Sequence, residues 1–259
     1  MHCAILRTSV VLKDTPVVTA AGELNYLNCE SLQDVIDYTM RESGYQAELD
    51  LSGLEYVDSS GLRVLAKAAL NARESGGFIG IRSISAQLVR MLDLSGLRDL
   101  FEFVPDPVVS EGPAHQAPSS AMSCAFRVPA SPEAACRARS RICEFALSSG
   151  MDALAVEDLR LGVGEAISNA IRHGAQEGGE LNITCSAENG EFVVKLVYPS
   201  EPFDPDAIPV PDMAHGPTGG MGIYFLRMVM SSVEYQFIDG KAIVTMTKRA
   251  GSTTARPIP

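Results

Sequence analysis

The sequence predicts an α/β protein of two domains, and three observations support this fold class. The 259 residues are 46% hydrophobic, which is enough material for two cores of ordinary size. Both halves mix short β-branched segments with segments whose apolar residues recur every three or four positions. A proline-rich stretch, PDPVVSEGPAHQAPSSA, separates the halves. We therefore expect domains at residues 1–104 and 122–249, a linker at 105–121 and a tail at 250–259.

The first half alternates strand and helix signals. The expected strands are CAILRTSVVL, PVVTAAG, QAELDL, FIGIRS and LFEFV, and the expected helices include LNYLNCESLQDVIDYTMRES and SAQLVRMLDLSG. Between QAELDL and FIGIRS, one further helical stripe is formed by Leu62, Leu65, Ala66 and Ala69. Such alternation predicts a mixed sheet covered by helices.

The second half begins with a strand, MSCAFRV, and a helix marked by Ser131 at its cap and Pro132 in its first turn. A second helix, VEDLRLGVGEAISNAIRHG, has apolar residues at helical spacing. Four strand candidates follow, namely LNITCSA, FVVKLVY, VEYQFI and AIVTMTK. A helical layer on an antiparallel sheet, an α/β sandwich, accounts for this order.

Composition argues against several function classes. The net charge is −11 and no basic run or stripe is present, so direct binding of nucleic acid or anionic lipid is not expected. No apolar run approaches the roughly 18 residues of a membrane-spanning helix, and we expect a cytoplasmic protein. The six cysteines form no C-x-x-C pair, and we interpret them as reduced, mostly buried thiols.

The segment Asp58-Ser59-Ser60-Gly61 lies where a predicted strand gives way to a predicted helix. A serine just before a helix is a favoured N-cap, worth roughly 1 kcal/mol, but this structural role needs only one hydroxyl. The free N–H groups of a helix N-terminus would also stabilise a phosphate ester. A phosphoserine there would add roughly two negative charges and could act as a binding switch.

Around these serines, residues 1–104 resemble the STAS domain of bacterial anti-sigma-factor antagonists. The resemblance rests on TAAGELNYLNCESL, DLSGLEYVDSSGLRVLAKA and SISAQLVRMLDLSGLRDLFEF, in the family's order. It implies that Ser59 is phosphorylated by a partner kinase, and that the unphosphorylated domain binds this kinase to release a sigma factor. Ser60 is then expected to be the helix cap. The chain departs from the family at Asn25, where an aspartate commonly follows G-E-L.

In the second half, Glu165 and Asn169 are four residues apart on a predicted helix, so both side chains project from one face. A carboxylate can orient or deprotonate a hydroxyl, and a carboxamide oxygen can ligate Mg²⁺. Polar pairs at this spacing are also common on solvated helix faces. Further along, Gly219, Gly220 and Gly222 precede an apolar helical run, where backbone amides could approach phosphates.

Together these motifs resemble the ATP-binding domain of anti-sigma-factor serine kinases, relatives of the histidine-kinase, gyrase and Hsp90 ATPase domains. The resemblance spans residues 122–249 and rests on E-x-x-x-N-x-x-x-H-G, P-F-D-P and G-G-M-G-I-Y-F-L-R. It implies ATP and Mg²⁺ as cofactors, Glu165 as the catalytic general base and Asn169 as the metal ligand. Gly219, Gly220 and Gly222 would lie near the phosphates.

The adenine side departs from that family. A D-x-G motif normally precedes P-F-D-P; its aspartate accepts from the adenine amino group and its glycine admits the base. Here Tyr198 and Ser200 stand at those positions. Loss of a hydrogen bond to a charged group costs on the order of 1.5–3 kcal/mol, about a 10- to 150-fold loss of affinity.

The sequence thus predicts a two-domain partner-switching regulator of sigma-factor activity, in which a phosphorylatable antagonist domain is fused to an ATP-dependent serine kinase-like domain. The alternative is a non-catalytic interaction protein with a degenerate nucleotide site. Expected partners are a sigma factor, an anti-sigma-factor kinase or antagonist proteins. Pairing between the two domains of one chain and a homodimer are further options.

Overall fold

The protein consists of two compact units, each built on one five-stranded sheet. The computed structural model describes residues 5–12, 15–103, 122–174, 179–212 and 220–251. The predicted linker, Gly219 and most of the predicted tail lie outside these residues. Among the described residues, no helix has the length and apolar character needed to cross a membrane.

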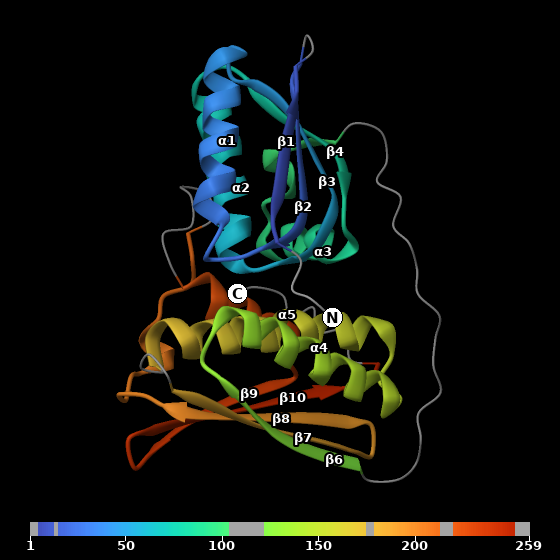
Figure 1. Ribbon diagram of the computed structural model, residues 1–259, viewed down its shortest axis with the longest axis vertical. Helices are drawn as coiled ribbons and strands as arrows, with labels where there is room; N and C mark the ends of the chain where they lie inside the picture. Colours follow the sequence, from blue (N-terminus) through green and yellow to red (C-terminus); the bar gives the residue numbers. More distant parts are fainter. Residues whose placement is uncertain (1–4, 13–14, 104–121, 175–178, 213–219, 252–259) are drawn as a thin grey trace. The chain divides into compact units, whose positions relative to one another are not determined.

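The N-terminal domain contains the mixed sheet that the sequence predicts, in strand order β1-β2-β3-β4-β5. β1 pairs antiparallel with β2, and the remaining neighbours are parallel. Figure 1 shows α1 and α2 side by side against this sheet. The elements are β1 (Arg7–Val11), β2 (Val17–Leu24), α1 (Cys29–Glu42), β3 (Gln46–Val57), α2 (Ser59–Glu74), β4 (Phe78–Ile84), α3 (Ala86–Ser95), η1 (Arg98–Leu100) and β5 (Glu102–Phe103).

The hydrophobic periodicity of the first half is confirmed by burial. The stripe predicted on α2 is fully inside the domain, because Leu62, Leu65, Ala66 and Ala69 are all buried. Leu32 and Ile36 of α1 are buried too, whereas β1 is exposed along its whole length. The core of this domain therefore lies between β2–β4 and the helices, with β1 as an exposed edge.

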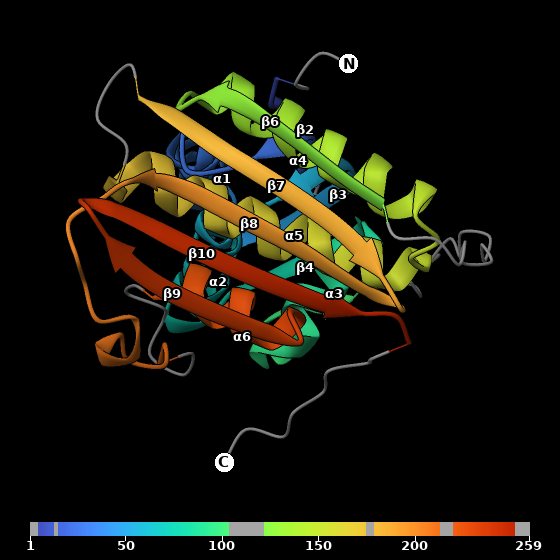
Figure 2. The same ribbon diagram turned by 90° about the horizontal axis from the view of Figure 1, so that it is seen from below.

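The C-terminal domain is an antiparallel sheet with helices on one face (Figure 1). Its strand order is β6-β7-β8-β10-β9, which can be followed in Figure 2. The elements are β6 (Met122–Pro129), α4 (Pro132–Ser148), α5 (Ala153–Asn169), the π-helix η2 (Ala170–Gly174), β7 (Glu180–Glu188), β8 (Glu191–Pro199), η3 (Pro205–Ala207), α6 (Met221–Val229), β9 (Ser232–Ile238) and β10 (Lys241–Arg249).

Local signals explain where these elements begin and which face they bury. Ser131 caps α4 by accepting from the Ala134 N–H at 3.3 Å, with Pro132 in the first turn, as the sequence predicts. β8 buries every second residue, so one face of the sheet meets the helices. The five cysteines in the described part of the chain are free, and all but Cys124 are buried.

Candidate functional site

The helix α5 carries both polar residues that the sequence singles out in the C-terminal domain. Asp152 caps the start of α5 by accepting from the Ala155 N–H at 2.8 Å. Its last two turns carry Glu165 and Asn169, and the backbone then widens into the π-helix η2. Glu165 is only 2% exposed. Glu165 therefore does not lie on a solvated helix face.

Gly222, in the first turn of α6, packs directly onto this pair. A Cβ atom added at Gly222 would lie 2.7 Å from Glu165 Oε2 and 3.4 Å from both Asn169 Oδ1 and Nδ2. A Cβ at that distance would force the Glu165 carboxylate or α6 to shift, because real Cβ contacts are longer. The structure therefore brings Glu165, Asn169 and Gly222 together, although Gly222 is 53 residues beyond Asn169 in the chain.

The polar atoms at this contact fit a ligand that carries phosphates and Mg²⁺. Asn169 Nδ2 is buried and has no hydrogen-bond partner in the described part of the chain. A buried amide without a partner is uncommon in proteins and calls for an explanation such as a ligand. Gly220, with φ of +74°, turns the backbone just ahead of α6 in a conformation that favours glycine. The N–H groups at the start of α6 add partial positive charge beside the Glu165 carboxylate.

Tyr198, near the end of β8, places an uncharged ring against η2. Its side chain is 3% exposed and points from β8 into the layer of helices. The ring lies against Gly174, where an added Cβ would be 2.3 Å from Cε2 and 2.5 Å from Cδ2. Burial raises the pKa of the Tyr198 hydroxyl to about 12, so this position is neutral at ordinary pH. The structure therefore places a neutral ring at this position, where the sequence resemblance leads us to expect a carboxylate.

The segment after β8 is fastened to β9 and α6. Ser200, the second departure, donates its N–H to Gly240 O at 3.1 Å and its hydroxyl to Glu201 O at 2.9 Å. Phe203 of the P-F-D-P motif stacks edge-on, with ring centroids 5.6 Å from Tyr235 and 5.2 Å from Phe237. Phe203 thus packs the loop onto β9.

Arg227 of α6 holds the same loop from the other side. Its guanidinium donates to Asp206 Oδ1 at 2.6 Å and to Pro205 O at 3.2 Å. Both side chains are exposed, so this ion pair contributes little to stability. The pair joins η3 to α6.

In the N-terminal domain, the predicted cap is wrong. Asp58, not Ser60, is the N-cap of α2: its Oδ1 accepts from the N–H groups of Ser60 at 2.8 Å and Gly61 at 3.0 Å. Its Oδ2 accepts from the Tyr26 N–H at 3.0 Å. A carboxylate reaches three donors at once, which a serine hydroxyl cannot do. Ser59 is consequently the first residue of α2.

The departure at Asn25 leaves the adjacent turn intact. Asn25 Oδ1 accepts from the Leu27 N–H at 3.0 Å, a contact that an aspartate would make in the same way. Asn28 completes the turn, because its Oδ1 accepts from the Asn25 N–H and its Nδ2 donates to Glu23 O. The turn between β2 and α1 is thereby held next to Asp58.

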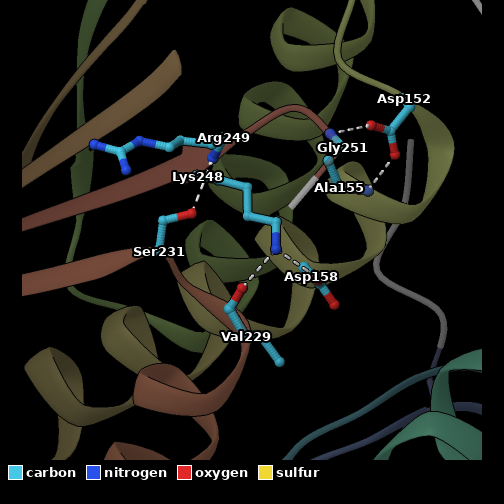
Figure 3. A network of polar contacts seen from close by, with 8 residues as sticks. All are labelled: Asp152, Ala155, Asp158, Val229, Ser231, Lys248, Arg249 and Gly251. Carbon is cyan, nitrogen blue, oxygen red and sulfur yellow. Dashed lines mark hydrogen bonds and ion pairs between the residues drawn. The ribbon is translucent and has the colours of Figure 1, made fainter. Parts of the chain in front are cut away.

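Sequence reasoning missed a buried ion pair in the C-terminal domain. Lys248 Nζ lies 2.6 Å from Asp158 Oδ2 and also donates to Val229 O at 2.9 Å (Figure 3). A signal was present, because Lys248 continues the buried alternation of β10 after Ala242, Val244 and Met246. A lysine at a core-facing position requires a buried acceptor.

Two family models match this chain over separate ranges. Residues 11–105 match the family described as Mlab, STAS domain, and residues 128–248 match the family described as Histidine kinase-like ATPase domain. The N-terminal half carries a STAS domain, and the C-terminal half carries a histidine kinase-like ATPase domain.

Individual relatives match one domain each. An anti-sigma-B factor antagonist of Bacillus subtilis is 27% identical over 85 residues, which are 33% of this chain and 77% of that protein. The serine-protein kinase RsbW of Listeria innocua is 26% identical over 136 residues, 48% of this chain and 84% of that protein. The crystal structure of an anti-sigma factor antagonist from Mycobacterium paratuberculosis has a TM-score of 0.36 and 26% identity, and the match covers 39% of this chain and 87% of that one.

Proposed function

We propose that this chain is a bacterial partner-switching regulator of sigma-factor activity, in which a phosphorylatable antagonist domain is joined to an ATP-dependent serine kinase-like domain. Each half is similar to proteins that are named as one of the two components, an anti-sigma-B factor antagonist and a serine-protein kinase. Partners of the proposed regulator are a sigma factor, an anti-sigma-factor kinase or separate antagonist proteins.

The observation that carries the kinase part is the packing of Gly222 onto Glu165 and Asn169. In the proposed reaction, the Glu165 carboxylate accepts the proton of the attacking serine hydroxyl. The serine oxygen then bonds to the γ-phosphorus of ATP as the bond to the bridging oxygen breaks. The Asn169 carboxamide oxygen is the proposed Mg²⁺ ligand, and Gly219, Gly220 and Gly222 are the proposed phosphate-side residues. Bound Mg²⁺ would supply the positive charge that offsets charge on the phosphates.

Ser59 is the proposed acceptor of the phosphate. It begins α2 directly after Asp58, whose carboxylate is occupied with backbone N–H groups. The phosphate would be placed at the N-terminus of a 16-residue helix, where the helix dipole favours negative charge. The kinase-like domain of the same chain, of a second copy or of a separate protein could deliver it.

The experiment that tests the proposal is intact-mass spectrometry of the purified full chain after incubation with Mg-ATP. We expect wild type to gain one phosphate, and Ser59→Ala and Glu165→Ala to gain none. Ser60→Ala is the matched control and should be phosphorylated like wild type. A gain that survives Ser59→Ala would move the acceptor elsewhere. Wild type that binds no nucleotide and gains no mass would refute the kinase part.

One observation favours a second candidate function, a non-catalytic interaction module. The neutral ring of Tyr198 fills space against Gly174 on the adenine side of the proposed site. In this alternative, the domain keeps the shape of a kinase and binds sigma-factor regulators without turnover. The two functions are separated by the mass experiment, together with a nucleotide-binding measurement on wild type.

A further inference from the structure

The helix α6 contacts α5 at both of its ends. At the start of α6, Gly222 lies on Glu165, as described above. At its far end, a Cβ atom added at Gly162 of α5 would be 3.0 Å from Met230 Cγ and Sδ and 3.2 Å from Val229 Cγ2. A glycine at each contact lets the two helices approach each other at these two points.

The far end of α6 is held by the Lys248–Asp158 pair. Lys248 Nζ donates to the backbone oxygen of Val229, the last residue of α6, and to Asp158 of α5 (Figure 3). Both charged side chains are 1% exposed. The ammonium group thus caps the C-terminus of α6, where the helix dipole is negative, and joins it to one position on α5.

The spacings of the two contacts are equal. Asp158 and Glu165 are seven residues apart on α5, and Gly222 and Val229 are seven residues apart on α6. Seven residues are two helical turns, about 10.5 Å along the axis. Because Gly222 and Val229 belong to one rigid helix, holding Val229 beside Gly162 and, through Lys248, near Asp158 restricts where Gly222 can meet Glu165.

Apolar packing alone would hold this register less strictly. The sequence of α6, MGIYFLRMV, is almost entirely apolar, and contacts between apolar side chains have little directional preference. A shift of one residue would move the helix about 1.5 Å and turn it by about 100°. Such a shift would carry Val229 O out of hydrogen-bonding distance of Lys248 Nζ unless the lysine side chain moved with it.

We propose that Lys248 and Asp158 are positioning residues for the phosphate side of the site: they set the register of α6 along α5, so that Gly222 meets Glu165 and Asn169. Their effect on the proposed site is transmitted through α6. The link to nucleotide binding rests on the proposed function, whereas the register itself does not.

The test uses the full chain with Asp158→Leu/Lys248→Met, which replaces both charges with apolar groups. Such a double replacement of a buried ion pair commonly preserves stability, so loss of folding should not obscure the result. Arg249→Met is the matched control, because it removes the neighbouring charge of β10 from an exposed pair with Glu191. Thermal unfolding gives the stability of each variant.

Two readouts follow register and ligand binding separately. The first is measured without nucleotide. It consists of the NMR signals of the Gly222 backbone amide and the Asn169 side-chain amide, together with hydrogen exchange over residues 221–229. The second is the dissociation constant for Mg-ATP. In the double variant we expect both amide signals to shift, faster exchange in α6, and affinity lower by on the order of ten- to a hundredfold. Arg249→Met should match wild type in all of these.

A stable double variant with wild-type amide signals and exchange would overturn the proposal. If wild type binds no nucleotide, the proposed kinase function fails, and the NMR signals and exchange still decide the register. Should the double variant not fold, Asp158→Asn takes its place, because it keeps an oxygen for Lys248 and loses only the charge. We expect smaller changes of the same kind from it, and unchanged signals would count against the proposal.

Discussion

The ring of Tyr198 lies on the backbone of Gly174, so closely that a Cβ atom at Gly174 would be 2.3 Å from the ring carbon Cε2. This contact closes the junction between β8 and the π-helix η2. The same π-helix continues α5 directly beyond Asn169. The proposed phosphate side and the proposed adenine side of the site are therefore adjacent in the fold.

Replacing Tyr198 should change nucleotide affinity. We expect Tyr198→Asp to bind Mg-ATP about 10- to 150-fold more tightly than wild type, because the carboxylate restores an acceptor for the adenine amino group and the bulky ring is removed. Isothermal titration calorimetry measures this difference. Tyr198→Phe is the control: it keeps the ring and supplies no acceptor, so it should show no gain. Equal affinity of the aspartate variant and wild type would contradict the assignment of this position.

A methyl group at Gly222 should disrupt the site. In Gly222→Ala the new Cβ would be 2.7 Å from Glu165 Oε2, so α6 or the carboxylate must move. We expect the phosphorylation rate and the affinity for Mg-ATP each to fall on the order of a hundredfold. Gly190→Ala is the comparison: it strains a residue with φ of +77° in open space, at the turn between β7 and β8. It should lose stability and keep wild-type affinity.

Removing the cap of α2 should destabilise the STAS domain. Asp58→Ala takes away the acceptor of three backbone N–H groups, and we expect the free energy of unfolding to fall by about 1–3 kcal/mol. The loss is measured by denaturant unfolding, followed through a signal that reports on the N-terminal domain. Ser60→Ala should cost less, because its side chain is not the cap. The reverse order of the two losses would restore Ser60 as the capping residue.

Alkaline pH should lower the free energy of unfolding of the ATPase-like domain, because Tyr198 ionises more readily in the unfolded chain. Burial raises the pKa of this hydroxyl from 10.0 to about 12, so the unfolded chain releases the proton first as the pH rises. Stability that is complete below pH 10 is therefore lost between pH 10 and about 12, with a slope that approaches ~1.4 kcal/mol per pH unit. Unfolding curves between pH 8 and about 11 measure it. Tyr198→Phe should remove this part of the slope and leave the part due to Tyr235, whose pKa burial also raises.

Breaking the buried ion pair on one side only should be costly. Lys248→Met leaves the Asp158 carboxylate buried without its ammonium partner, and we expect a loss of about 3–5 kcal/mol in the free energy of unfolding. Arg249→Met, on the exposed neighbouring pair, should cost under about 1 kcal/mol. Comparable losses in the two variants would show that Lys248 is not held as the structure has it.

Much of the fold could be predicted because helices and strands follow from the local spacing of apolar residues. The α2 stripe from Leu62 to Ala69 and the alternation along β8 both depend on neighbours in sequence, and burial confirms them. The pairing of Glu165 with Asn169 follows from helix geometry in the same way. The prediction of the α2 cap was wrong. Both Asp58 and Ser60 are residue types that cap helices. The Asp58 carboxylate is the cap, and it also accepts from the Tyr26 N–H on another segment.

The sequence by itself determined the fold class, the spacing of Glu165 and Asn169, and the substitution of a tyrosine and a serine in the nucleotide motif. Only the tertiary structure decided that Gly222 contacts this pair, that Tyr198 packs on Gly174, and that Lys248 meets Asp158 across 90 residues of chain. The physical reason is that hydrogen-bond and packing patterns within one helix or strand repeat over three or four residues or fewer. Contacts between α5, α6 and β10 depend instead on how whole elements pack against one another. A single methyl group or a single charge can change that packing.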